Sequence, residues 1–262
     1  KMAFTVLAVM PGVWHIGVCM GVCRTLLEGE NAAMLVDTGY GIEDVADFMR
    51  HMTDLPLTVF LTHNHHDHAM GARCFPETYM LEADMADWRM FTNDEMRRRV
   101  LTQAIGKNLP VDEKTFLAGE IPLPKVMKPG VIDLGGLTAE IIEAPGHTPG
   151  SAVVYVPERK LLLSGDDWNP CTWLFFPQAL GLREYRSNMR GIQQLPFEKV
   201  LCPHREALYD RWMFDDFFNA LTDGNLRAAE PVNIAPYEQI DTCQATLPHD
   251  QVLVFDWAKS GL

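Results

Sequence analysis

Six consecutive residues, from His63 to His68, read His-Asn-His-His-Asp-His and combine four histidines with one aspartate. They follow the apolar, β-branched run 57–62, which predicts a short buried strand that ends where the histidines begin. Neutral imidazoles and carboxylates are ligands that divalent zinc, iron and manganese accept. A lone histidine is usually a surface or core residue, whereas this cluster at the end of a strand indicates a metal site.

Three later segments each place one candidate ligand just after an apolar run. His147 lies in the turn Pro-Gly-His-Thr-Pro-Gly after the strand-like run 137–143. Asp166 follows Leu-Leu-Leu-Ser-Gly, and His204 ends the run Val-Leu-Cys-Pro-His. Because neighbouring strands of a sheet bring their ends to one edge, we expect these side chains to converge on segment 63–68.

In order along the chain, these motifs are His-X-His-X-Asp-His, Pro-Gly-His-Thr-Pro-Gly, Ser-Gly-Asp and Pro-His. Together they resemble the metallo-β-lactamase superfamily of dinuclear metal hydrolases. The upstream segment 34–39, Met-Leu-Val-Asp-Thr-Gly, is similar to the family's strand followed by Asp-Thr-Gly. The resemblance therefore covers residues 3–204.

The resemblance implies a role for each candidate ligand. One metal ion would be held by His63, His65 and His147, the second by Asp67, His68 and His204, and Asp166 would bridge the two. Asp37 would orient a ligand histidine or the ligand loop without touching a metal, although an Asp before a Gly can also simply open a turn. His66 fills a variable position of the motif and is interpreted as a residue of the pocket rim.

Two metal ions that share a carboxylate lower the pKa of a bound water from about 15.7 towards ~7. The resemblance thus implies a hydroxide bridged between two metals that attacks a small acyl substrate. Asp67 would be both a ligand and the proton shuttle to the leaving group. We expect zinc, with iron or manganese as alternatives, because histidine and carboxylate accept all three.

The ligand set narrows the substrate class. Where Asp166 stands, β-lactamases of similar pattern usually carry Cys or Ser, whereas thioester hydrolases of the glyoxalase II type and lactonases share the full set. The chain departs from both, since 209–221 is not basic and 167–169 lacks the tyrosine typical of lactonases. The leading hypothesis is a hydrolase of an ester, thioester or lactone. The alternatives are a phosphodiesterase and a non-haem iron oxidoreductase with the same ligands.

Aromatic residues crowd the proline-flanked stretch that follows Asp166. They either line a substrate pocket or lid, or pack beneath the loop. The three arginines at 183, 186 and 190 share one helical face, where they could receive an anionic group or form a surface stripe. The candidate pocket residues are Trp168, Trp173, Phe175, Phe176 and Arg186.

Composition limits the partners of the chain. Its 262 residues carry a net charge of −13, which argues against nucleic acid because phosphate binding relies on Lys and Arg. We expect a small-molecule substrate and no membrane span, since no apolar run approaches ~18–20 residues. Six irregularly spaced cysteines, with Cys19 and Cys23 interpreted as small buried hydrophobes, and the lack of an obvious leader predict a cytoplasmic protein. Oligomeric state is not indicated.

Hydrophobic periodicity predicts two runs of strands, each associated with helices. We expect strands at 3–9, 13–18, 21–27, 32–37, 57–62 and 78–81, then 131–134, 137–143, 151–156, 160–164 and 198–202, with an edge strand at 252–256. Helices are expected at 42–52, at 83–105 with a break near 92–93, at 183–195 and at 208–221, with a connecting excursion at 106–130 that borders the active site. With the resemblance, this pattern predicts one domain, 1–262, of the α+β class, folded as a four-layer αββα sandwich.

Overall fold

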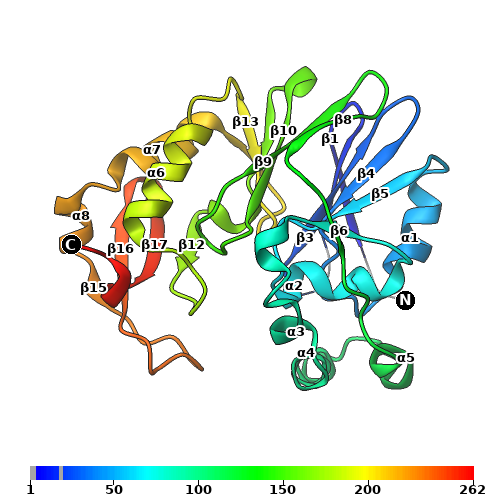
Figure 1. The fold of residues 1–262 in the computed structure, drawn as a ribbon, viewed down its shortest axis with the longest axis horizontal. Coiled ribbons are helices and arrows are strands. Elements are labelled where there is room, and N and C mark those ends of the chain that lie inside the picture. The colour runs from blue at the N-terminus through cyan, green and yellow to red at the C-terminus, as the bar shows by residue number, and fades with distance from the viewer. Residues whose placement is uncertain (1–3, 18–19) are drawn as a thin grey trace.

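The structure is a computed structural model that describes residues 4–17 and 20–262. Two β-sheets pack face to face, and helices cover their outer faces (Figure 1). This arrangement confirms the predicted α+β class and the αββα order of layers. Residues 3 and 18 of the predicted strands, and Cys19, lie outside the described residues.

The first sheet keeps the order of the chain. Its strands are β1 (Thr5–Met10), β2 (Val13–Gly17), β3 (Cys23–Glu28), β4 (Ala33–Val36), β5 (Leu57–Phe60), β6 (Tyr79–Met80) and β7 (Lys125–Val126). The strands from β1 to β4 pair antiparallel, and those from β4 to β7 pair parallel. In β4, Met34 and Val36 face the second sheet, whereas Ala33 and Leu35 face helix α1 (Val45–Met52). A strand that is buried on both faces explains this unbroken apolar run.

In the second sheet, too, successive side chains of a strand are buried on opposite faces. Its order is β14 (Leu208–Asp210), β13 (Lys199–Leu201), β11 (Leu161–Leu163), β10 (Ala152–Val156), β9 (Thr138–Glu143) and β8 (Gly130–Asp133). Val154 of β10 packs between the sheets, whereas Val153 and Tyr155 pack outward beneath α6 (Leu182–Ile192) and α7 (Arg211–Ala220). One strand therefore joins the central core to the outer core.

A third, four-stranded sheet was not predicted. Its order is β12 (Cys171–Leu174), β17 (Gln251–Asp256), β16 (Thr242–Leu247) and β15 (Glu230–Pro231), and it packs in the outer layer beside α6 and α7. The prediction of 252–256 as an edge strand is wrong, because β17 pairs with both β12 and β16. The predicted helix 208–221 is also too long. Its first three residues form β14, because they pair with β13, and α7 begins at Arg211.

A group of helices covers one end of the first sheet. It comprises α2 (His66–Ala69), η1 (Met70–Cys74), η2 (Glu82–Asp84), α3 (Trp88–Thr92), α4 (Asp94–Gly106) and α5 (Glu113–Leu117), and it buries Trp88, Val100 and Phe116 together. The predicted break near 92–93 is confirmed, because Asn93 ends α3 and its side chain accepts a hydrogen bond from Met96 N at the start of α4. The excursion 106–130 contains α5 and β7.

The remaining short helices lie between or after these elements along the chain. They are η3 (Pro157–Arg159), η4 (Gly165–Asp167), α8 (Asp223–Arg227), η5 (Pro248–Asp250) and η6 (Trp257–Lys259). Within residues 4–17 and 20–262, none of the helices has the length and apolar character that crossing a bilayer requires.

Candidate metal centre

The seven predicted ligands lie just beyond the C-terminal ends of four strands, β5, β9, β11 and β13. In the second sheet, β9 and β11 both pair antiparallel with β10, and β11 pairs parallel with β13. These three strands therefore run in the same direction and end at the same edge. The loop after β5 in the first sheet meets this edge, so that both sheets contribute ligands.

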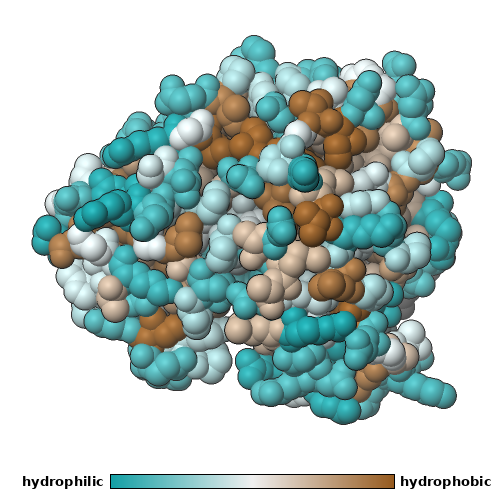
Figure 2. Space-filling view, viewed as in Figure 1, coloured by the Kyte–Doolittle hydropathy of each residue, from teal (hydrophilic) through white to brown (hydrophobic). Residues whose placement is uncertain are grey.

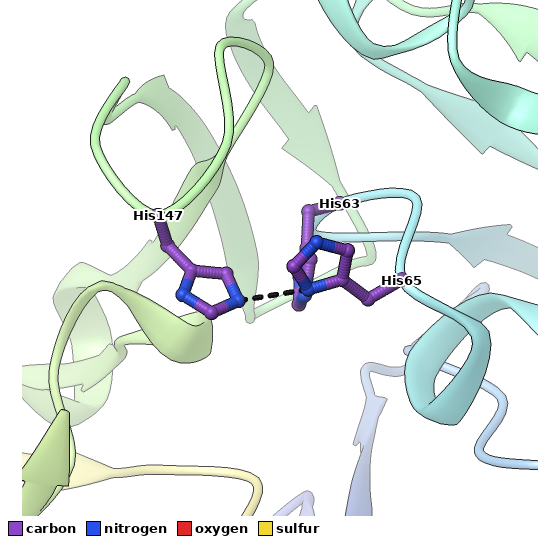
Figure 3. Close-up of side chains that lie close together, drawn as sticks. All are labelled: His63, His65 and His147. Carbon is purple, nitrogen blue, oxygen red and sulfur yellow. Dashed lines mark hydrogen bonds between the residues drawn. The ribbon is translucent and has the colours of Figure 1, made fainter. Parts of the chain in front are cut away.

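The first group consists of His63, His65 and His147, which are all buried. Each offers a ring nitrogen, and these nitrogens lie within 4.8 Å of one another. Figure 3 shows His147 on one side and His63 and His65 on the other, with His65 Nδ1 and His147 Nε2 only 2.9 Å apart. His147 Nδ1 donates to the carbonyl of Trp173 at 2.6 Å, which places the lone pair of the ring on Nε2, the nitrogen that faces His65 Nδ1. His63 Nδ1 similarly lies 3.0 Å from Thr62 Oγ1.

The second group consists of Asp67, His68, Asp166 and His204. Asp166 Oδ2 lies 3.0 Å from His204 Nε2 and 3.3 Å from His68 Nε2. The same oxygen lies 3.5 Å from His147 Nε2 of the first group. Asp67 Oδ2 faces His68 Nε2 at 3.5 Å and His204 Nε2 at 3.7 Å. One carboxylate thus stands between the two groups, at the position that a bridging ligand requires.

Burial sets the charge of the first group. It holds the pKa of His63 and His65 well below the usual histidine range and also lowers the pKa of His147. These imidazoles are therefore neutral at pH 7, which is the form that binds a metal.

In the second group, neighbouring charges outweigh the effect of burial on the pKa values. Burial opposes charge on Asp166, but the charges of His204 and His68 outweigh it and hold the pKa of this carboxyl well below its usual range. Burial likewise opposes charge on His68, yet the Asp166, Asp67 and Asp37 carboxylates hold its pKa well above the usual range. The carboxylates of this group thus require positive charge beside them, and a divalent cation would supply it.

Three ligand atoms of this centre are buried without a hydrogen-bond partner among the described residues. They are His63 Nε2, His68 Nε2 and Asp166 Oδ1. Buried polar atoms in folded proteins nearly always have partners, so three orphaned atoms at one place indicate ligands directed at an ion. The donor set of imidazoles and carboxylates therefore fits two divalent metal ions.

Asp37 makes the contacts that its expected orienting role requires. It follows β4 with a left-handed backbone, φ 65°, and is buried. Its Oδ2 lies 3.0 Å from His68 Nδ1, and its Oδ1 accepts from Thr62 N at 2.8 Å. The hydrogen bond to Nδ1 directs His68 Nε2 towards Asp166.

Sequence reasoning missed a second buried acid, Asp84 of η2, that ties two ligand loops together. Its carboxylate accepts from Asn64 N at 3.1 Å, Thr148 Oγ1 at 2.7 Å and Gly150 N at 2.6 Å. The approach is close, since a Cβ on Gly150 would lie 2.6 Å from Asp84 N. Asp84 therefore fixes the loop of His63 and His65 relative to the loop of His147. An acid on a short turn has no sequence pattern that could have revealed this role.

Asp167, next to the proposed bridging residue, also supports a ligand. Its Oδ1 accepts from the backbone N–H of His147 at 2.9 Å, and the side chain is fully buried. Burial holds the pKa of Asp167 well above its usual range. Asp166 thus faces the ligand imidazoles, whereas Asp167 holds the backbone of His147.

The structure brings only some of the predicted pocket residues to the metal centre. The ring of Phe176 lies 4.8 Å from His65 and 5.4 Å from His147, and Trp173, 37% exposed, lies 6.2 Å from Phe176. Phe175 is fully buried behind Phe176, at 4.7 Å. An aromatic wall therefore stands beside the first group.

Two predicted pocket residues lie elsewhere. Trp168 is fully buried in the outer core, where it packs on Phe214 and donates to Gln251. Its place in a pocket is a misassignment, because the turn that follows Asp166 directs the Trp168 side chain into the outer core. Arg186 pairs with Asp223 on the outer side of α6, at 2.7 Å, rather than facing the ligands.

Three residues beside the centre were not predicted. Phe91 of α3 lies 4.5 Å from the His65 ring, and Tyr237 lies 5.4 Å from Phe176. Gln178 Nε2 lies 2.6 Å from His65 Nε2. His66 stands outside both ligand groups, with its ring 5.7 Å from Tyr40.

Comparisons with known proteins agree with the resemblance that the sequence motifs show. The sequence model of the metallo-β-lactamase superfamily matches residues 24–204. The acyl-coenzyme A thioesterase MBLAC2 of Gallus gallus is 26% identical over 200 residues, which are 68% of this chain and 70% of that protein.

Solved structures share the fold. A metallo-β-lactamase family protein from Thermus thermophilus has a TM-score of 0.59 and 20% identity, covering 84% of this chain and 82% of its own. The protein TTHA1623, solved in a di-iron-bound form, has a TM-score of 0.51 and 21% identity over 74% of this chain and 92% of its own.

We predict that the protein binds two metal ions per chain, one for each ligand group. His147→Ala and Asp166→Ala should each lower the metal content, because each removes a donor that the remaining residues cannot replace. His66→Ala should leave it unchanged. Elemental analysis after metal saturation and desalting measures both effects. One equivalent or fewer in the intact protein, or equal loss in His66→Ala, would contradict the assignment.

We also predict that Asp84→Asn weakens metal binding about 10- to 100-fold, as expected when a residue that positions ligands is replaced. An amide in place of the carboxylate faces some of these N–H and O–H donors with its own N–H groups, which should lower the free energy of unfolding by about 1–3 kcal/mol. Metal titration and denaturant unfolding measure the two effects. Glu82→Ala, an exposed acid in the same turn, is the matched control. Identical behaviour of the two variants would refute the positioning role.

Proposed function

Because the chain belongs to the metallo-β-lactamase superfamily, we propose that it is a metal-dependent hydrolase of small acyl substrates, with thioesters the favoured class and esters and lactones related candidates. The observation that carries this proposal is the position of Asp166 Oδ2, within 3.5 Å of imidazole nitrogens from both ligand groups. Two divalent ions held by these groups would supply a shared hydroxide at neutral pH. We propose zinc. Iron and manganese suit the same ligands, and the di-iron form of TTHA1623 gives iron a precedent in this fold.

Asp67 is the residue to which we assign proton transfer. Its side chain is 16% exposed, and its Oδ2 points towards His68 and His204. Burial opposes its charge, but His68, His66 and His204 hold its pKa well below the usual range, so that it is ionised at pH 7. An ionised carboxylate at the mouth of the centre can accept the proton of the nucleophile and pass it to the leaving group.

The aromatic wall favours substrates with an apolar acyl group. Phe176 and Phe91 both pack against the His65 ring. Trp173 of β12 and Tyr237 of the loop before β16 pack against Phe176 and extend this surface. Such a wall binds an apolar chain and excludes water from the reacting carbonyl. The likeness to the thioesterase MBLAC2 supports a thioester as the bond that is cleaved.

The net charge of −13 leads us to propose a small-molecule substrate rather than a polynucleotide. The cytoplasmic location stays a prediction from the cysteine pattern.

We predict that the metal-loaded protein hydrolyses acyl thioesters, esters or lactones with an apolar acyl group faster than β-lactams or polynucleotides. Activity should disappear on chelation and return with added zinc. A spectrophotometric panel of these substrates, run beside an oxygen-consumption assay of the iron-loaded protein, makes the comparison. Cleavage of polynucleotides alone, or oxygen consumption without hydrolysis, would replace this proposal with the phosphodiesterase or oxidoreductase alternative.

We predict that Trp173→Ala raises KM about tenfold with little change in kcat, because removing a half-exposed ring loses about 1.4 kcal/mol of apolar contact in ground and transition states alike. Phe175→Ala should instead lower the free energy of unfolding by about 3–5 kcal/mol, since this ring is fully buried. Trp212→Ala removes an exposed ring on α7 and serves as control. Steady-state kinetics and thermal unfolding separate these effects. A wild-type KM in Trp173→Ala would remove this residue from the acyl site.

A further inference from the structure

A cavity of about 200 Å³ lies in the outer layer of the molecule, away from the metal centre. Its lining residues come from α6, from the end of α7 and from the segment that joins α7 to α8. None of the metal-centre residues lines it. The cavity is therefore separate from the metal centre.

Two arginines from one face of α6, Arg186 and Arg190, line this cavity. They are four residues apart, which places both side chains on the same side of the helix. Arg186 Nη1 donates to Asp223 Oδ1 at 2.7 Å, and the guanidinium has four further N–H donors. The Arg190 side chain has neither an ion pair nor a hydrogen bond among the described residues. Most of the cationic donors at the cavity are thus available to a ligand.

The acids nearby are each paired with an arginine. The hydrogen bond and charge of Arg186, together with the charges of Arg227 and Arg183, hold the pKa of Asp223 below its usual range, so that Asp223 balances the charge of Arg186. Asp215 is paired with Arg211 at 2.9 Å. Figure 2 shows strongly hydrophilic side chains over this part of the surface. The arginines at this surface contrast with the net charge of −13 of the whole chain.

The other residues that line the cavity include two with side-chain amides and one with an aromatic ring. Gln193 and Asn219 present amides, with Gln193 Nε2 lying 3.5 Å from Asn219 Oδ1. Phe218 presents a half-buried ring that is held from behind by Phe214 at 4.6 Å. The cavity therefore combines cationic forks, amide groups and one flat apolar surface.

We propose that this cavity binds a small organic phosphate monoester. A phosphate monoester carries a charge of about −1.5 to −2 at pH 7; the unpaired guanidinium of Arg190 offers it a positive charge, and the planar forks of Arg190 and Arg186 offer N–H donors to its oxygens. The Phe218 ring offers a surface for a flat organic group attached to the phosphate. A cavity of about 200 Å³ accommodates a phosphate with one small ring rather than a dinucleotide.

The test uses phenylphosphonate, a phosphate-like dianion on a flat ring whose carbon–phosphorus bond resists hydrolysis. Isothermal titration calorimetry on the metal-loaded protein should show saturable binding, and benzoate, with a single charge, should bind at least tenfold more weakly. Arg186→Gln and Arg190→Gln should each weaken phenylphosphonate binding about tenfold or more. Arg98→Gln, which removes an exposed arginine of α4, should bind like wild type. Circular dichroism should show each variant folded.

Three outcomes would overturn the proposal. The first is the absence of saturable binding up to about 10 mM phenylphosphonate. The second is equal weakening by Arg98→Gln, which would indicate a general charge effect. The third is binding that survives both α6 substitutions and inhibits hydrolysis competitively, which would place the phosphonate at the metal centre instead.

Discussion

The Asp166 carboxylate lies within 3.5 Å of imidazoles from both ligand groups, and much of the structure follows from the need to keep it charged while buried. A buried carboxylate is costly unless cations or hydrogen-bond donors surround it. His204 and His68 meet this need in the second group, while the neutral His147 faces the same carboxylate from the first group. The strands that carry them must therefore end at one edge, with both sheets contributing.

The positions of the ligand side chains depend on three buried acids that belong to neither ligand group. Asp37 sets the orientation of His68, Asp84 joins the loops after β5 and β9, and Asp167 holds the backbone of His147. Each bond spans segments that are far apart in the chain. The two-sheet interface, packed with apolar residues that alternate along β4 and β10, gives these loops a rigid base.

The two faces of helix α6 contact different parts of the molecule. On its inner face, Tyr185 donates to the carbonyl of Asp167 and Asn188 donates to that of Pro145 at 2.7 Å, so the helix supports the loop that carries His147. Its outer face presents Arg186 and Arg190 to a separate cavity. The helix thus lies directly between the metal-ligand loop and the proposed phosphate site.

The sequence by itself determined the candidate ligands, since the residue types and their places after apolar runs can be identified locally. Periodicity alone indicated only a mixture of strands and helices, and the αββα layers followed from the family resemblance of the motifs. The sequence could not determine which aromatic residues after Asp166 face the site. Trp168 and Phe176 are chemically alike, and only the packing of the outer core buries one and places the other beside His65. The third sheet, β14 and the role of Asp84 were likewise decided by tertiary structure. Each depends on pairing or hydrogen bonding between segments distant in the chain, and short-range patterns carry no information about such contacts.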